Sequence, residues 1–63
     1  MNNNYLLRIM YMLAEDATIP AEIKKDVAKR VADWIQLNGT EDSEYIKSQY
    51  NYLMRAWTYY SSN

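Results

Sequence analysis

The stretch YIKSQYNYLMRAWTYY, residues 45–60, decides the fold, because it places five tyrosines and one tryptophan on a segment with helical periodicity. Successive residues of an α-helix are rotated by about 100°, so every third or fourth side chain shares a face. One arc of this helix is predicted to face the core, and it contains Ile46, Tyr50, Leu53, Met54, Trp57 and Tyr60. The helix therefore carries enough apolar surface to organise a small helical core.

A second stripe on the same helix consists of Tyr45, Tyr52 and Tyr59, which are seven residues apart and line up beside the first arc. Two interpretations stay open. In the first, the helix lies in the groove between two others, and the rings belong to the core with their hydroxyls at its wet rim. In the second, the rings form an exposed ridge for a partner, since tyrosine offers large contact area at low entropic cost.

A first helix is predicted over about residues 4–15, preceded by asparagines that can accept the free N–H groups of its first turn. Its apolar side chains recur at spacings of three and four, at Leu6, Ile9, Met10 and Leu13. Leu7, Met12 and Ala14 lie outside this arc and also need to be covered. Two helices with surplus apolar surface favour a homodimer.

The second helix is predicted over residues 20–37 and begins at Pro20, because proline is tolerated in the first helical turn. Thr18, just upstream, is available as its cap. Apolar side chains then repeat at helical spacing, at Ile23, Val27, Val31, Trp34 and Ile35. Gly39 is expected to adopt the left-handed conformation that ends many helices.

The third helix is predicted over about residues 42–60, with Thr40, Asp42 and Ser43 as competing caps. No segment shows sustained alternation, and the only glycine and the only proline both stand at breaks between helices, so strands are disfavoured. We therefore expect an all-α, compact three-helix fold with up-down-up topology, and a single domain over residues 1–63.

The composition excludes most kinds of catalytic chemistry. The chain has 63 residues, no cysteine, no histidine, one glycine and a formal net charge of −1. These counts leave little for nucleophilic or general-base catalysis or for a glycine-rich phosphate loop, so we predict no enzyme and no cofactor. The first apolar run is interrupted by Arg8 and is shorter than the roughly 20 residues of a membrane span, which favours a soluble, cytoplasmic protein without membrane contact.

Arg30 falls inside the apolar arc of the second helix, where a surface arginine is not normally placed. Asp26 and Asp33 lie four residues before and three after it and can pair with its charge, and Asp42 could reach it through the turn. In one interpretation Arg30 braces the helical hairpin with its stem packed on Trp34. In the other, it is presented to a partner.

The segment RVADWIQLNGTEDSEYIKSQ, residues 30–49, is the most distinctive part of the chain. It resembles a family of small uncharacterised proteins encoded in phages and prophages of Gram-positive bacteria. The shared pattern is an Arg-x-x-Asp-Trp helix end, a glycine turn, an acidic cap and a Tyr followed by a Gln, here Arg30, Asp33, Trp34, Gly39, Asp42, Tyr45 and Gln49. This family commonly has two glycines in the turn, where this chain has Asn38 and Gly39. The resemblance implies a phage-like origin and a compact helical fold, and no chemistry.

The carboxylates of Glu41, Asp42 and Glu44 gather near the predicted turn. Their spacing does not match an EF-hand loop, and negative charge at the positive end of a helix dipole already explains them. We therefore predict no metal site.

Nucleic-acid binding is the alternative from a different class of function, because Lys24, Lys25, Lys29 and Arg30 all lie on the second helix. Residues 20–39 hold these four cations against the three acids Glu22, Asp26 and Asp33, so their net charge is only +1. The third helix begins with acids that would face phosphate. A solvated basic face is the preferred interpretation, and a small DNA-binding regulator is the alternative.

The sequence thus predicts a non-enzymatic protein-interaction module that associates first with itself, as a dimer, and then with a host or phage protein that it modulates. Its contact residues are predicted to be Tyr45, Tyr52, Tyr59 and Arg30. Its core is predicted to include Trp34, Trp57, Leu6, Ile9 and Leu53.

Overall fold

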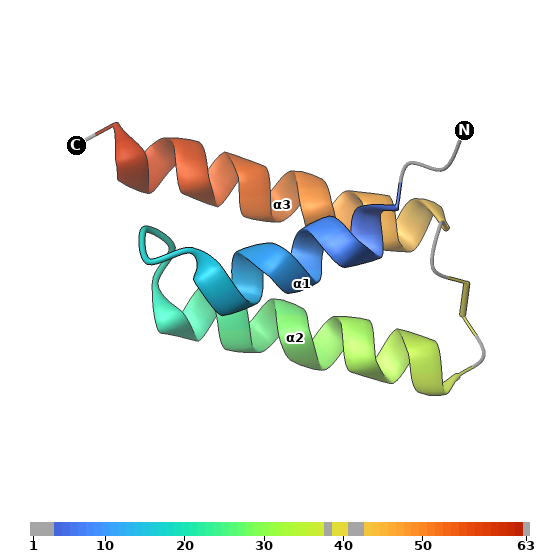
Figure 1. The fold of residues 1–63 in the computed structure, drawn as a ribbon. Helices are drawn as coiled ribbons and strands as arrows, with labels where there is room; N and C mark the ends of the chain where they lie inside the picture. The colour runs from blue at the N-terminus through green and yellow to red at the C-terminus, as the bar shows by residue number, and fades with distance from the viewer. Residues whose placement is uncertain (1–3, 38, 41–42, 63) are drawn as a thin grey trace.

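A computed structural model describes residues 4–37, 39–40 and 43–62 of the chain. Within these ranges three helices follow one another, α1 (Tyr5–Glu15), α2 (Ala21–Gln36) and α3 (Glu44–Ser61) (Figure 1). The chain runs along α1, returns along α2 and runs forward again along α3. The predicted all-α three-helix fold with up-down-up topology is confirmed, and every helix boundary lies within two residues of its predicted position.

Side chains cap the first and third helices as the sequence predicts. The Asn4 Oδ1 atom accepts a hydrogen bond of 3.1 Å from the backbone N–H of Leu7. Among the three candidates for α3, Ser43 occupies the cap position, and its Oγ accepts a bond of 3.3 Å from the N–H of Ile46. Asp42 lies outside the described residues. Each cap satisfies an N–H group that has no partner inside its helix.

The start of α2 differs from the prediction. Pro20 occupies its cap position without a side-chain bond, so the assignment of Thr18 as the cap is wrong. Instead the Asp16 Oδ2 atom accepts hydrogen bonds from the N–H groups of Thr18, at 3.1 Å, and of Ile19, at 2.8 Å. A short aspartate side chain commonly bonds the backbone two or three residues ahead in this way, and here it orders the turn between α1 and α2.

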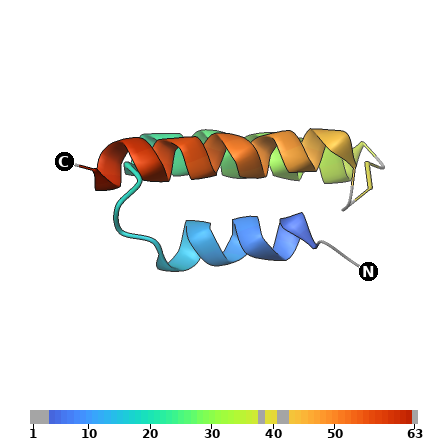
Figure 2. The same cartoon turned by 90° about the horizontal axis from the view of Figure 1, so that it is seen from above.

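The core is small and entirely aliphatic. It is centred on α3, which packs against both α1 and α2, whereas α1 and α2 approach each other less closely (Figures 1 and 2). The buried side chains in the described ranges are Ile9, Ile19, Val27, Val31, Ile46 and Leu53. The molecule measures 37 × 26 × 17 Å. Its radius of gyration of 11.5 Å exceeds the value of about 10.6 Å expected for a compact domain of this length.

The buried face of α3 is rotated relative to the predicted arc. Ile46 and Leu53 are fully buried as expected, but Trp57 and Tyr60 remain 40% and 39% exposed. The prediction of Trp57 as a core anchor is therefore wrong. At about 1.5 Å per residue, α1 spans roughly 16 Å and α3 roughly 27 Å, so the last turns of α3 extend beyond α1 (Figure 1).

Two other predicted core positions are also partly in water. Met10 is 54% exposed and Ile35 is 38% exposed. The apolar face of α1 turns toward α3 rather than α2, so Tyr5 and Met12 pack on the core in place of Met10. Leu6 packs there as well, as predicted.

Gly39 is constrained after the end of α2 by a steric contact. Its predicted left-handed conformation stays a prediction, because its φ depends on Asn38, which lies outside the described residues. Its N–H donates to the carbonyl oxygen of Trp34 at 2.9 Å, and the Trp34 Nε1–H donates to the carbonyl oxygen of Thr40 at 3.1 Å. The indole ring lies so close to the Gly39 backbone that an added Cβ would overlap it. Any larger residue at this position must therefore displace the indole ring of Trp34.

Replacement of Gly39 by alanine is expected to lower the free energy of unfolding by about 1–3 kcal/mol, because the new methyl group must displace the indole. Thermal unfolding followed by circular dichroism measures this loss. In a Trp34→Ala background the same Gly39→Ala change is expected to be nearly neutral, since the ring that it collides with is gone. An equal loss in both backgrounds would contradict the steric role of Gly39.

Candidate functional site

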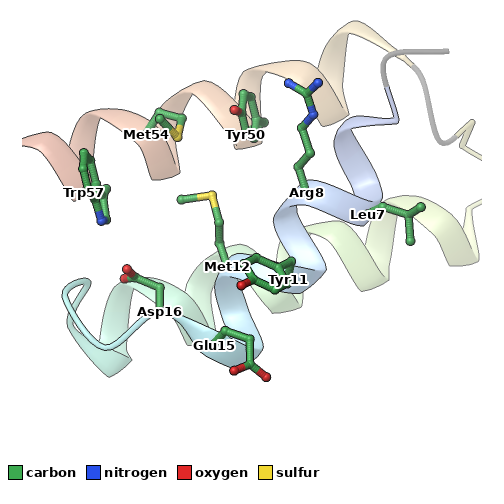
Figure 3. A pocket seen from close by; sticks show the side chains of 9 residues that line it. All are labelled: Leu7, Arg8, Tyr11, Met12, Glu15, Asp16, Tyr50, Met54 and Trp57. Carbon is green, nitrogen blue, oxygen red and sulfur yellow. The ribbon is translucent and has the colours of Figure 1, made fainter.

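A groove of about 630 Å³ lies on the surface between α1 and α3 (Figure 3). Most of its lining is apolar. The nine lining residues come from the two helices and the start of the following turn, and they are Leu7, Arg8, Tyr11, Met12, Glu15, Asp16, Tyr50, Met54 and Trp57. Among these nine lining residues, no nucleophile is paired with a general base.

The two walls of the groove follow from helical periodicity. Tyr50, Met54 and Trp57 stand at spacings of four and three on α3, so they share one face of that helix. Met12 of α1 points toward Met54 across the groove, and both are half-buried (Figure 3). Methionine is flexible and polarisable, and is used at binding surfaces that adapt to a partner.

One end of the groove carries positive charge. The Arg8 guanidinium carbon lies 5.7 Å from the ring centroid of Tyr5 and 5.8 Å from that of Tyr50. These two rings are themselves 5.2 Å apart and inclined by 45°. The cluster joins the first turn of α1 to α3 through cation–π and aromatic contacts.

The opposite end carries negative charge. Glu15 and Asp16 line the groove at the C-terminal end of α1, where the Glu15 side chain points away from α3, while Arg8 stands beside Tyr50 at the other end (Figure 3). The groove is therefore apolar in its middle and oppositely charged at its two ends.

The outer edge of the groove exposes large apolar side chains. Leu7 is 61% exposed and Tyr11 is 69% exposed, both on α1. A second, smaller hollow continues from Met54 along α3 and is lined by Asn51, Met54, Arg55, Thr58 and Tyr59. The Tyr59 ring lies 4.9 Å from that of Tyr60 in an edge-to-face arrangement at 87°. The exposed apolar surface thus extends from α1 across the groove to the end of α3.

The predicted tyrosine stripe is divided between the core and the surface. Tyr45 and Tyr52 are half-buried and pack against the core, as the first interpretation of the stripe requires. The Tyr45 ring lies 4.8 Å from the ring of Trp34, inclined by 30°. Tyr59 is 66% exposed and lies outside the core. The assignment of all three as partner contacts stays a prediction, and only Tyr59 belongs to the extended exposed surface.

Arg30 contacts α3 rather than the acids of its own helix. Its Nη1 atom donates to the Oε1 atom of Gln49 at 3.3 Å, and its guanidinium carbon lies 5.6 Å from the Tyr52 ring centroid. These are the partners that the structure shows for Arg30, in place of the predicted Asp26 and Asp33. The contacts fit the interpretation in which Arg30 braces the hairpin between α2 and α3.

The distinctive segment of the sequence is explained by these contacts. Of the residues that carry the family resemblance, Arg30 bonds Gln49, Trp34 lies over Gly39, and Tyr45 stacks on Trp34. The pattern thus joins the end of α2 to the start of α3. We call this set of contacts among the described residues of the pattern the clasp between α2 and α3.

The candidate basic face of α2 is only partly available to a ligand. Lys24 donates from its Nζ atom to the carbonyl oxygen of Asp16, and Arg30 is engaged with Gln49. Lys25 and Lys29 are exposed. Two of the four cations therefore take part in contacts within the fold, and the DNA-binding alternative stays a prediction.

The groove is the feature that sequence reasoning missed. The surplus Leu7 and Met12 on α1 pointed toward it, but the pairing of α1 with the Tyr50 and Trp57 side of α3 was not predicted. Among residues 4–37, 39–40 and 43–62, no three of the metal-ligating side chains form a cluster that could hold an ion, and Glu41 and Asp42 lie outside those ranges. Within the same ranges, no helix combines the length and hydrophobicity that crossing a bilayer requires.

Comparison with known proteins gives one family. A model described as a family of unknown function (DUF6877) matches residues 4–58, which cover all of α1 and α2 and most of α3. No curated protein and no solved structure matches the chain. The matched range includes the clasp between α2 and α3 and every residue that lines the groove between α1 and α3.

Substitution of Arg30 by methionine is expected to lower the free energy of unfolding by about 0.5–1 kcal/mol, because the contact with the Tyr52 ring is lost at an exposed site. Lys29→Met on the same helix is the matched control and should change stability less, since both substitutions have similar helix propensity. Thermal unfolding compares the two. A loss of binding without a change in melting temperature would contradict the bracing role of Arg30.

Proposed function

This chain belongs to the family of unknown function DUF6877, and we propose that it is a non-enzymatic protein-interaction module whose binding surface is the groove between α1 and α3. The observation that carries this proposal is the exposed apolar surface along that groove, with Leu7, Tyr11 and Trp57 at 61%, 69% and 40% exposure. Continuous apolar patches of this kind, bordered by polar residues, mark interaction sites on small soluble proteins.

The composition of the groove supports a protein partner. Protein interfaces are enriched in tyrosine, tryptophan, methionine and arginine, and the groove contains all four, at Tyr11, Trp57, Met54 and Arg8. Its walls are two neighbouring helices, an arrangement that accepts the apolar face of a third helix. Tryptophan, tyrosine and arginine also supply most of the energetically dominant contacts at interfaces.

The amino-acid composition of the chain supports a function by binding, without catalysis. With no cysteine and no histidine in the sequence, acid–base and nucleophilic catalysis lack their commonest side chains. We therefore propose that the protein acts by occupying the surface of another molecule, with no cofactor and no substrate turned over.

The proposed partners are a second copy of the chain and then a host or phage protein that is modulated by the contact. The resemblance of residues 30–49 to phage and prophage proteins of Gram-positive bacteria supports this setting, and a site of action in the bacterial cytoplasm is part of the proposal.

A photo-crosslinking amino acid in place of Tyr11 is expected to form covalent adducts with protein in the bacterial cell, because Tyr11 is exposed at the edge of the groove. The same amino acid in place of Lys29, which is exposed on α2, is the matched control. Denaturing electrophoresis and mass spectrometry identify the adducts. Adducts at position 11 and none at position 29 support the groove as the binding surface.

Absence of adducts at position 11 in cells of the natural host type would remove the proposed function. A gel-shift titration with duplex and single-stranded DNA across salt concentration tests the DNA-binding alternative. Steeply salt-dependent binding at submicromolar protein would favour that alternative, and weaker binding would leave the groove as the functional surface.

A further inference from the structure

We propose that the groove between α1 and α3 is one half of a two-fold symmetric dimer interface, in which Arg8 of each copy faces Glu15 of the other. This inference rests on the proposed function and names its first partner, a second copy of this chain. In a two-fold interface the same patch serves both subunits, so the patch must be complementary to itself. The distribution of charge along the groove meets that requirement.

The self-complementarity comes from the spacing of two charges on α1. Arg8 and Glu15 are seven residues apart and line opposite ends of the groove (Figure 3). Seven residues make about two helical turns, or roughly 10.5 Å along the helix axis. When a second copy is turned by 180° about an axis midway between the two residues, each arginine meets the glutamate of the other copy, and both charges are matched at once.

The side chains near that axis are apolar. Tyr11 and Met12 lie midway between Arg8 and Glu15 in the sequence, and Tyr11 is 69% exposed. The two-fold axis therefore places the Tyr11 residues of the two copies next to each other. Apolar contacts lie at the centre and charged pairs at the rim, which is the usual anatomy of a protein interface.

Arg8 can serve both the fold and the interface. Its guanidinium carbon lies 5.7 Å and 5.8 Å from the ring centroids of Tyr5 and Tyr50, within the range of a cation–π contact. A guanidinium has five N–H donors, and a cation–π contact does not require a hydrogen bond from any of them, so these donors can meet a carboxylate. Arg8 is exposed, and the two aromatic contacts restrict the positions of its side chain before association. A preformed contact of this kind reduces the entropy lost on binding.

The surface along the groove is large enough for a stable dimer interface. A stable interface buries about 800 Å² on each partner, and the whole chain exposes 4695 Å². The groove, the exposed Leu7 and Tyr11, and the hollow that ends at Tyr59 lie along one continuous surface of α1 and α3. Aromatic side chains bury about 150–250 Å² each when fully covered, so the exposed rings supply a large share of the required area.

Charge reversal tests the pairing directly. The single variants Arg8→Glu and Glu15→Arg each place like charges opposite one another, and each is expected to weaken dimerisation at least tenfold. An equimolar mixture of the two variants restores both opposite-charge pairs and is expected to dimerise as the unmodified chain does. Sedimentation velocity measures the mass, which is 7.5 kDa for the monomer and twice that for the dimer.

The mixture of the two variants distinguishes a loss of dimerisation from a loss of folding. Circular dichroism of each variant is measured first, because Arg8→Glu also removes the contacts with Tyr5 and Tyr50. Recovery of the dimer only on mixing supports the pairing. A monomeric unmodified chain at high micromolar concentration, or a dimer unaffected by either reversal, would overturn it.

A cysteine crosslink gives a second test that does not depend on charge. The natural chain has no cysteine, so Tyr11→Cys introduces a single thiol. Near a two-fold axis the two copies of residue 11 can approach the Cα separation of about 4.4–6.8 Å that a disulfide needs. We expect rapid, near-complete disulfide formation for Tyr11→Cys under mild oxidation and less than a tenth of that rate for Lys29→Cys. Equal rates at the two positions would overturn the proposed axis.

The failure of this inference is distinguishable from failure of the proposed function. If Tyr11→Cys does not crosslink and the chain is monomeric, but the photo-crosslinker at position 11 captures a different protein, the groove binds a partner and the two-fold dimer is wrong. If the photo-crosslinker at position 11 captures a second copy of the chain, both proposals are supported. If it captures nothing, both are overturned.

Discussion

The contact of the Trp34 indole with the turn beneath it organises the rest of the molecule. The ring lies over Gly39, donates to the carbonyl oxygen of Thr40 and stacks against Tyr45, so it joins the end of α2 to the start of α3. With this hairpin closed, one side of α3 is committed to α2. The short α1 must then cover the remaining apolar surface of α3, and its length permits only part of that.

The small core and the open groove both follow from the small number of residues in the chain. Only a few aliphatic side chains of the described part are fully buried, and the domain is 17 Å across in its thinnest direction. A domain of this size buries only about 60% of the surface that its unfolded chain exposes. Aromatic and methionine side chains that the core covers only in part or not at all line the groove between α1 and α3. The proposed binding of another molecule at the groove would cover this surface.

Sequence reasoning located the three helices and the caps of α1 and α3, but neither the start of α2 nor the orientation of each helix. Asn4 and Ser43 could be identified because caps depend on local chemistry, which the sequence contains. Trp57 and Tyr60 were misplaced because periodicity shows which residues share a face, and not which neighbour reaches it. The steric constraint on Gly39 was not predicted for a related reason, since it comes from a ring five residues away. The groove depends on how α1 and α3 pair, which is long-range information.

The two tryptophans occupy very different surroundings, and this gives the molecule built-in optical reporters. Trp34 is half-buried within the hairpin clasp, whereas Trp57 is 40% exposed at the wall of the groove. Indole emission shifts to shorter wavelength when water is excluded from the ring. Occupation of the groove should therefore change the emission of Trp57 and leave that of Trp34 unaltered. In unlabelled protein, Trp57 then reports complex formation and Trp34 reports unfolding of the hairpin.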